Sequence, residues 1–125
     1  MRTVIQPPEL PSANSTYSQA IQAGGFIFIS GQIGVNPATG RLAGDDIAEQ
    51  AKQAIENLVA ILHAAGSALD NVVSVNIYLT EYGELARVNQ VYGTYFPRNG
   101  PSKTSCGVTA LYGGAKFEIQ ATALA

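Results

Sequence analysis

The sequence predicts an α+β domain in which a mixed sheet of about six strands is covered on one face by two helices. Two segments with helical periodicity are each flanked by segments with strand-like alternation, which gives the order ββ(β)αβαββ. Short glycine-rich turns near both ends of the chain indicate hairpins, so antiparallel pairs accompany the strands that a helix connects. With 125 residues the chain has room for a single domain, residues 1–125.

The first third of the chain predicts an irregular arm followed by a hairpin. Residues 6–16 are rich in Pro, Ser, Asn and Thr, which favour loops. Segments 17–23 and 26–30 read as strands, and the glycine pair between them allows the positive φ angles of a two-residue turn. Residues 30–35 are expected to extend the second strand, with a bend at Gly31.

A long helix over residues 46–65 is the clearest element. Its apolar residues recur every three or four positions and fall on one face. They are Ile47, Ala51, Ala54, Ile55, Leu58, Val59 and Leu62. Asp46 is placed to cap the first turn, with Glu49 three residues later as in a capping box, and Gly66 is placed to end the helix in the left-handed conformation.

A strand, a second helix and two further strands complete the predicted order. Residues 73–80 alternate between apolar and polar side chains. The second helix is expected over about 83–96, because Pro97 then ends it. Strands over 102–110 and 116–123 are separated by a Tyr-Gly-Gly turn.

The composition favours a homo-oligomer. Charged residues make up 13% of the chain, about half the usual share of roughly 25%, so we expect part of the surface to be covered by other copies. Seven Lys and Arg stand against nine Asp and Glu without a basic cluster, so no nucleic-acid partner is expected. No run approaches the roughly 18 apolar residues of a membrane span, and no signal-peptide pattern is present. We therefore expect a cytoplasmic protein with no membrane partner.

Conventional catalytic sets are hard to assemble from these residues. The only histidine, His63, lies on the flank of the long helix, and one histidine with one cysteine cannot build a zinc centre without carboxylates. We therefore predict no metal and no cofactor. Cys106 lies in the middle of a strand, where it is a small buried hydrophobic residue, a pocket-lining residue or a reactive thiol.

The last strand carries a polar row on one face. By alternation one face presents Lys116, Glu118, Gln120 and Thr122, and the other presents Phe117, Ile119 and Ala121. A polar row turned away from the helices either meets water or lines a cleft between subunits. The cleft also accounts for the low charge, so we favour it.

Four short motifs add a family resemblance. They are Ser30-Gly31-Gln32-Ile33, Val88-Asn89, Ser105-Cys106 and Phe117-Glu118-Ile119-Gln120. With the element order, they resemble the Rid proteins, also called the YjgF family, from residue 17 to the C-terminus. The resemblance implies a chorismate-mutase-like (YjgF-like) fold and a homotrimer with its sheets inside and clefts at the subunit boundaries. It also implies hydrolysis of reactive enamines and imines, such as 2-aminoacrylate, to 2-keto acids and ammonia without a cofactor.

The same resemblance assigns the candidate site. It places in the cleft the pocket residues Tyr17, Ser30, Gly31, Asn89 and Cys106. Thr104 stands where deaminating members carry an arginine that binds the substrate carboxylate. Because threonine cannot form this ion pair, we expect carboxylate binding to be weaker by roughly 10- to 150-fold. Lys103 points to the opposite face and is a poor substitute. Gln120 matches the glutamate that orients the attacking water, and an amide cannot act as a base.

Thr104, Cys106 and Gln120 are therefore the candidate catalytic residues, and Glu118, on the same strand face as Gln120, joins the substrate-binding set. The sequence favours a homotrimeric imine or enamine deaminase acting on a small-molecule metabolite, with activity weakened or altered by Thr104 and Gln120. The alternative is a non-catalytic trimer that binds a small metabolite, with a regulatory role. A chaperone-like protein or a ribonuclease, also attributed to relatives, has less support in these residues.

Overall fold

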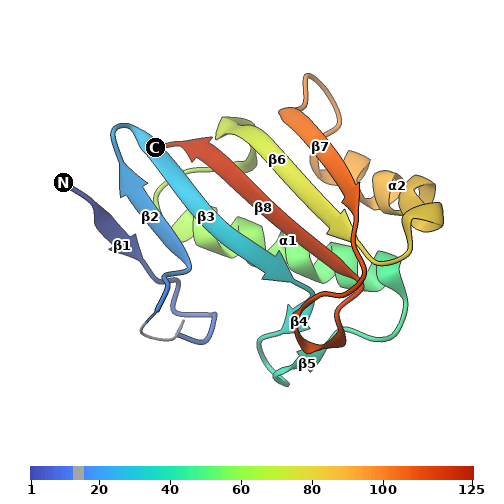
Figure 1. Ribbon diagram of the computed structural model, residues 1–125. Coiled ribbons are helices and arrows are strands. Elements are labelled where there is room, and N and C mark those ends of the chain that lie inside the picture. Colours follow the sequence, from blue (N-terminus) through green and yellow to red (C-terminus); the bar gives the residue numbers. More distant parts are fainter. Residues whose placement is uncertain (13–15) are drawn as a thin grey trace.

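Six strands form one mixed sheet, and two helices lie on one side of it (Figure 1). The computed structural model describes residues 1–12 and 16–125. Across the sheet the strands are β1 (Thr3–Ile5), β2 (Ala20–Ala23), β3 (Phe26–Ile33), β8 (Phe117–Leu124), β6 (Val72–Leu79) and β7 (Ser102–Gly107). Neighbouring strands are antiparallel except for β6 and β7, which are parallel. The predicted sheet is thus confirmed.

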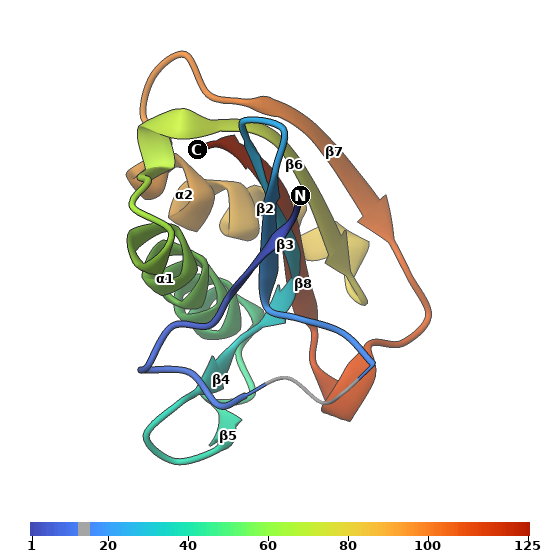
Figure 2. The same ribbon diagram turned by 90° about the vertical axis from the view of Figure 1, so that its left-hand side faces the viewer.

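The helices α1 (Ile47–Ala64) and α2 (Leu85–Tyr95) pack against each other on the same side of the sheet (Figure 2). The core lies between them and the inward side chains of β3, β6 and β8. A separate two-stranded ribbon is formed by β4 (Val35–Asn36) and β5 (Arg41–Leu42). No described helix is both long enough and apolar enough to cross a membrane.

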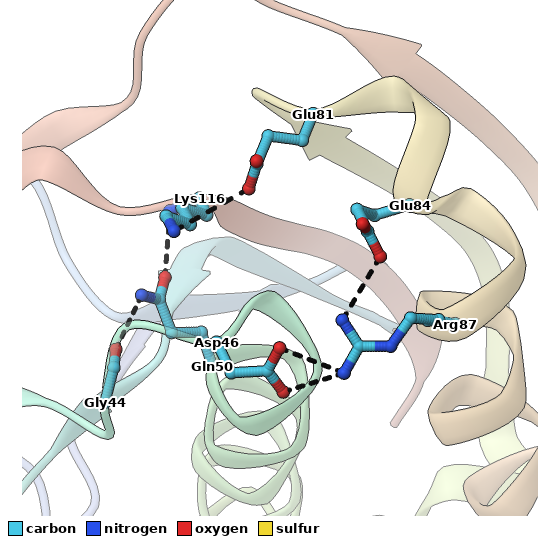
Figure 3. Close-up of polar contacts among 7 residues, drawn as sticks. All are labelled: Gly44, Asp46, Gln50, Glu81, Glu84, Arg87 and Lys116. Atoms are coloured by element: carbon cyan, nitrogen blue, oxygen red, sulfur yellow. Dashed lines mark hydrogen bonds and ion pairs between the residues drawn. The ribbon is translucent and has the colours of Figure 1, made fainter.

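The start of α1 differs from the predicted capping box. Asp46 is the N-cap residue, but its carboxylate makes no capping hydrogen bond. It pairs instead with Arg87 of α2 at 2.9 Å, and Arg87 also contacts Glu84 at 3.1 Å (Figure 3). The predicted cap is therefore wrong, because the carboxylate is drawn to a cation on the neighbouring helix.

The end of α1 follows the prediction. Gly66 has a φ angle of +75°, which favours glycine. Its N–H donates to the carbonyl of His63 at 3.0 Å, and the N–H of Ser67 donates to that of Leu62 at 2.8 Å. These two bonds form the Schellman motif, which satisfies two of the last carbonyls of the helix.

Gln50, buried on α1, ties the helix to two loops (Figure 3). Its Nε2 donates to the Gly44 carbonyl at 2.8 Å, and its Oε1 accepts from the Lys116 N–H at 2.8 Å. Gly34 crosses the same turn of the helix so closely that an added Cβ would lie 2.3 Å from the Gln50 carbonyl oxygen. The turn of α1 at Gln50 is thus fixed against the chain beyond β3 and the start of β8.

Several predicted boundaries shift, and the short strands β1 and β5 were not expected. The first strand of the hairpin begins at Ala20 rather than residue 17, and β7 ends at Gly107 rather than residue 110. The unexpected strand β1 pairs Thr3 with Gln22 at the edge of the sheet. It precedes the arm predicted over 6–16, of which residues 13–15 lie outside the described residues.

Candidate functional site

The sheet face that carries no helix, here called the open face, holds the polar row of β8. Glu118 and Gln120 are half-buried there, whereas Phe117, Ile119 and Ala121 are buried against the helices. The predicted alternation is confirmed. Phe26 and Phe28 of β3 share the open face and are 40% and 48% exposed. In a single chain, the open face therefore combines polar groups with exposed aromatic rings.

Strand pairing arranges the open face into two rows across β8, β6 and β7. One row consists of Gln120, Asn76 and Thr104, and the other of Glu118, Tyr78 and Cys106. Adjacent strands lie about 4.8 Å apart, so Thr104 and Gln120 are about 10 Å apart. The structure thus places the three predicted catalytic residues on one face, with β6 between Gln120 and the other two.

Glu118 lies against Gly31, at a bulge of β3. The pairing of β3 with β8 shifts between Ile29 and Gln32, and Gly31 lies within this interval. A Cβ on Gly31 would be 2.7 Å from a carboxylate oxygen of Glu118, so glycine leaves room for that carboxylate. Among residues 1–12 and 16–125 Glu118 has no hydrogen bond or ion pair. Burial raises the pKa of this carboxyl above its usual value.

Gln120, in contrast, is held by hydrogen bonds within the chain. Its Oε1 accepts from Asn76 Nδ2 at 2.9 Å. Its Nε2 donates to the carbonyls of Ile29 at 3.3 Å and Ala121 at 3.0 Å. Both amide hydrogens are thus engaged. Of Glu118 and Gln120, it is Glu118 whose side chain remains available to a ligand.

A pocket of about 320 Å³ opens over β1, β2 and β3 on the open face. Tyr17 and Ser30 line it, as expected for two of the predicted binding residues, and Phe28 supplies an apolar wall. Ser30 Oγ donates to the carbonyl of Ser18 at 2.6 Å, which fixes the hydroxyl beside Gly31. The pocket also includes Arg2, which the sequence analysis did not single out because it precedes the first predicted element.

Thr104 and Cys106 are exposed on β7 at the opposite side of the open face. The expectation of Cys106 as a small buried residue is wrong for the single chain, because β7 is an edge strand with few covered side chains. No group of three or more His, Cys, Asp or Glu in the described ranges is arranged to bind a metal ion.

Asn89 lies on α2 and not on the open face. It accepts a hydrogen bond from Lys103, whose ammonium also lies 4.4 Å from the centre of the Tyr92 ring. The predicted orientation of Lys103, away from Thr104, is therefore confirmed. Within one chain the structure does not bring Asn89 together with Glu118 and the pocket.

Comparisons with known proteins agree with this fold. The family model described as Endoribonuclease L-PSP matches residues 8–125. The rat 2-iminobutanoate/2-iminopropanoate deaminase is 41% identical over 99% of this chain and 90% of its own length. The crystal structure of the E. coli YjgF gene product has a TM-score of 0.90 at 34% identity, covering 98% of both chains. E. coli TdcF, solved with bound serine, has a TM-score of 0.92 at 31% identity with the same coverage. The chain therefore belongs to the Endoribonuclease L-PSP family, the Rid (YjgF) family that its motifs resemble.

Proposed function

We propose that the protein hydrolyses a small imine or enamine to a carbonyl compound and ammonia, with Glu118 as its acid–base group. The observation that carries this proposal is the Glu118 carboxylate, which is half-buried, has a raised pKa and lacks a partner in the described chain. It faces Gly31 beside the pocket. Relatives at about 40% identity that are named imino-acid deaminases support the reaction class.

Imine hydrolysis needs one group that first accepts and then returns a proton. Glu118 accepts a proton from water as the C–O bond forms, and the electrons of the C=N bond of the protonated imine move to nitrogen, which gives the carbinolamine C(OH)–NH2. Glu118 then returns this proton to the amine nitrogen. The C–N bond breaks and ammonia leaves as the hydroxyl proton passes to Glu118 and the C=O bond forms, and Glu118 finally releases that proton to water. Burial raises the pKa of Glu118 above its usual value, which makes its carboxylate a stronger base for the first step.

The surrounding residues bind and orient the substrate in this proposal. Tyr17, Ser30 and the Gly31 backbone form the wall beside Glu118, and Thr104 and Cys106 complete the cleft from β7. Gln120 is a positioning residue, since its amide holds the carbonyl of Ile29 at the start of the bulge.

A homotrimer with the open faces inside would complete the site. It would cover Phe26 and Phe28, and it would bring Thr104 and Cys106 of one subunit toward Glu118 of another. Sedimentation or light scattering should then give three times the chain mass of 13.1 kDa. A monomer at micromolar concentration would contradict the shared cleft.

The proposed function is tested by ammonia and keto-acid release from 2-aminoacrylate generated in situ. The protein should accelerate release above the spontaneous rate, and equal rates with and without protein would contradict the proposal. Thr104→Arg should lower the KM for this carboxylate substrate by roughly 10- to 150-fold, because it adds a charge-assisted pair to the cleft. Thr94→Arg adds the same charge on exposed α2 and should leave the KM unchanged.

A second candidate is a trimer that binds a small metabolite without converting it. The uncharged side chain of Thr104 favours it, as does the serine bound to the related TdcF. Calorimetric titration with L-serine separates the two. Saturable binding without any ammonia release from imines would support the binding function, and acceleration of imine hydrolysis would support the enzyme.

A further inference from the structure

A second pocket, of about 410 Å³, lies where β3 leads into the β4–β5 ribbon. Its apolar lining residues are Ile33, Val35 and Leu42. Arg41 and Asp45 line it as well, and because their charges are opposite, the pocket has no net preference for an anion or a cation. The loop between β7 and β8 adds the aromatic ring of Tyr112. This lining suits an uncharged, apolar group.

The second pocket adjoins Glu118 through Ile33. These two residues are paired across β3 and β8, and directly opposed residues share a face with their Cβ atoms about 4.5–5.5 Å apart. The Ile33 side chain thus lies beside Glu118 on the open face. Beyond it Val35 pairs with Leu42, so the apolar surface leads from Glu118 toward the ribbon. The pocket that contains Tyr17 is a different one, on the other side of the bulge.

Tyr112 offers this pocket an uncovered aromatic ring. The residue is 86% exposed, and its side chain makes no hydrogen bond or ring contact with any other residue in the described ranges. In Figure 1 the turn that precedes β8 lies at the same end of the sheet as β4 and β5. Aromatic rings pair favourably in stacked or edge-to-face arrangements, so this ring is a ready partner for an aromatic ligand.

We propose that the second pocket receives the side chain of the substrate and favours 2-imino acids whose side chain ends in an aromatic ring. Such a ligand places its C=N carbon at Glu118, and its side chain passes Ile33 and ends against Tyr112. Ring stacking and the burial of a phenyl group both favour this ligand over the methyl group of 2-iminopropanoate. The identification of the ligand as an imino acid rests on the proposed function, whereas the preference for an aromatic ring rests on the pocket.

The test is calorimetric titration with a matched pair of keto acids, 2-oxobutanoate and 2-oxo-4-phenylbutanoate, which differ only by a phenyl group. The phenyl compound should bind the natural protein about 10-fold more tightly, the lower end of the gain from burying an aromatic side chain. Tyr112→Ala should weaken its binding by about 5-fold, the worth of an aromatic pair, and leave 2-oxobutanoate unchanged. Tyr112→Phe keeps the ring and should keep the preference. Tyr82→Ala removes an exposed ring outside the pocket and should change neither affinity.

These titrations separate the two proposals. If the phenyl compound is preferred through Tyr112 while no imine releases ammonia, the role of the pocket is confirmed and the proposed function fails. Equal affinities of the two keto acids, or no saturable binding of either at millimolar concentration, would overturn the role of the pocket whatever the activity. A phenyl preference that survives Tyr112→Ala unchanged would overturn it too. So would a Tyr112→Ala variant that dissociates into monomers and binds both keto acids equally weakly, since Tyr112 would then belong to a subunit contact.

In active protein the same preference should appear in the kinetics. An amino-acid oxidase supplies the matched imines from L-homophenylalanine and L-2-aminobutanoate. The kcat/KM for the first imine should exceed that for the second by about 10-fold, and Tyr112→Ala should reduce this ratio by about 5-fold. A ratio of one in the natural protein would contradict an aromatic substrate.

Discussion

Replacing Glu118 with glutamine is expected to lower kcat for imine hydrolysis by about 100- to 10,000-fold. The amide has the size of the carboxylate and can still orient water, but it cannot accept or return a proton. The measurement is the steady-state rate of ammonia release at saturating imine concentration. As a control, Glu9→Gln removes an exposed carboxylate in the N-terminal arm and should keep full activity. A Glu118→Gln variant that keeps a tenth of the natural kcat would remove Glu118 from the proton-transfer role.

The raised pKa of Glu118 predicts two effects of pH, one on the activity of the natural protein and one on its stability relative to Glu118→Gln. In the natural protein, kcat should rise with pH as this carboxyl ionises, and the midpoint should lie above the usual pKa of glutamate. A raised pKa also means that the folded chain holds this proton more tightly than the unfolded chain. The stability that it contributes is present at low pH and is lost as pH rises through the folded pKa. At pH 7 Glu118→Gln should therefore be at least as stable as the natural protein.

Gly34→Ala is expected to reduce the free energy of unfolding by about 3 kcal/mol, the upper end for overpacking a closed core. The added Cβ would lie 2.3 Å from the Gln50 carbonyl oxygen and 2.7 Å from the Gln50 Cα. Both atoms belong to the backbone of α1, so no side-chain rotation relieves the contact. The helix has to move away from the sheet, and this also strains the Gln50 bonds to Gly44 and Lys116. Urea denaturation followed by circular dichroism measures the loss.

Gly93→Ala is the matched control for that substitution. Gly93 lies inside α2, and no atom comes within 4 Å of a Cβ built there. Alanine should therefore stabilise the protein by about 0.5–1 kcal/mol through its helix propensity. Equal unfolding midpoints for Gly34→Ala and the natural protein would show that α1 can shift without cost.

Side-chain periodicity was enough to predict the layers of this fold. The apolar face of α1 and the alternation of apolar and polar residues in β8 both result from burial against one core. Such burial produces a periodic pattern that can be read from the sequence. The buried amide of Gln50 was not predicted, because a polar residue on an apolar helix face gives no signal of the backbone groups it meets. The capping role of Asp46 failed for a related reason, since Arg87 comes from a different helix.

The site was predicted less completely than the fold. The alternation of β8 predicted that Glu118 and Gln120 share one face. It could not predict that Gln120 is held by hydrogen bonds while Glu118 is not, because this depends on the bulge of β3 and on Asn76 of β6. A bend at Gly31 was predicted, but no sequence pattern indicated that it would make room for Glu118, and the contact of Gln120 with Asn76 has no local pattern. Arg2 was missed because a three-residue strand such as β1 is too short to show periodicity.

The extra residue at the bulge of β3 serves the candidate site and is not needed for packing the core. Ile27 and Ile29 are buried on the core side before the bulge, and Gln32 and Gly34 are buried on that side after it. If Gly31 were deleted, a regular strand would keep all four inward, so the core has no need of the additional residue. The irregularity gives Glu118 its space at the expense of regular sheet pairing. A chain without Gly31 would thus keep the inward residues of β3 and lose the space that this glycine leaves for the Glu118 carboxylate.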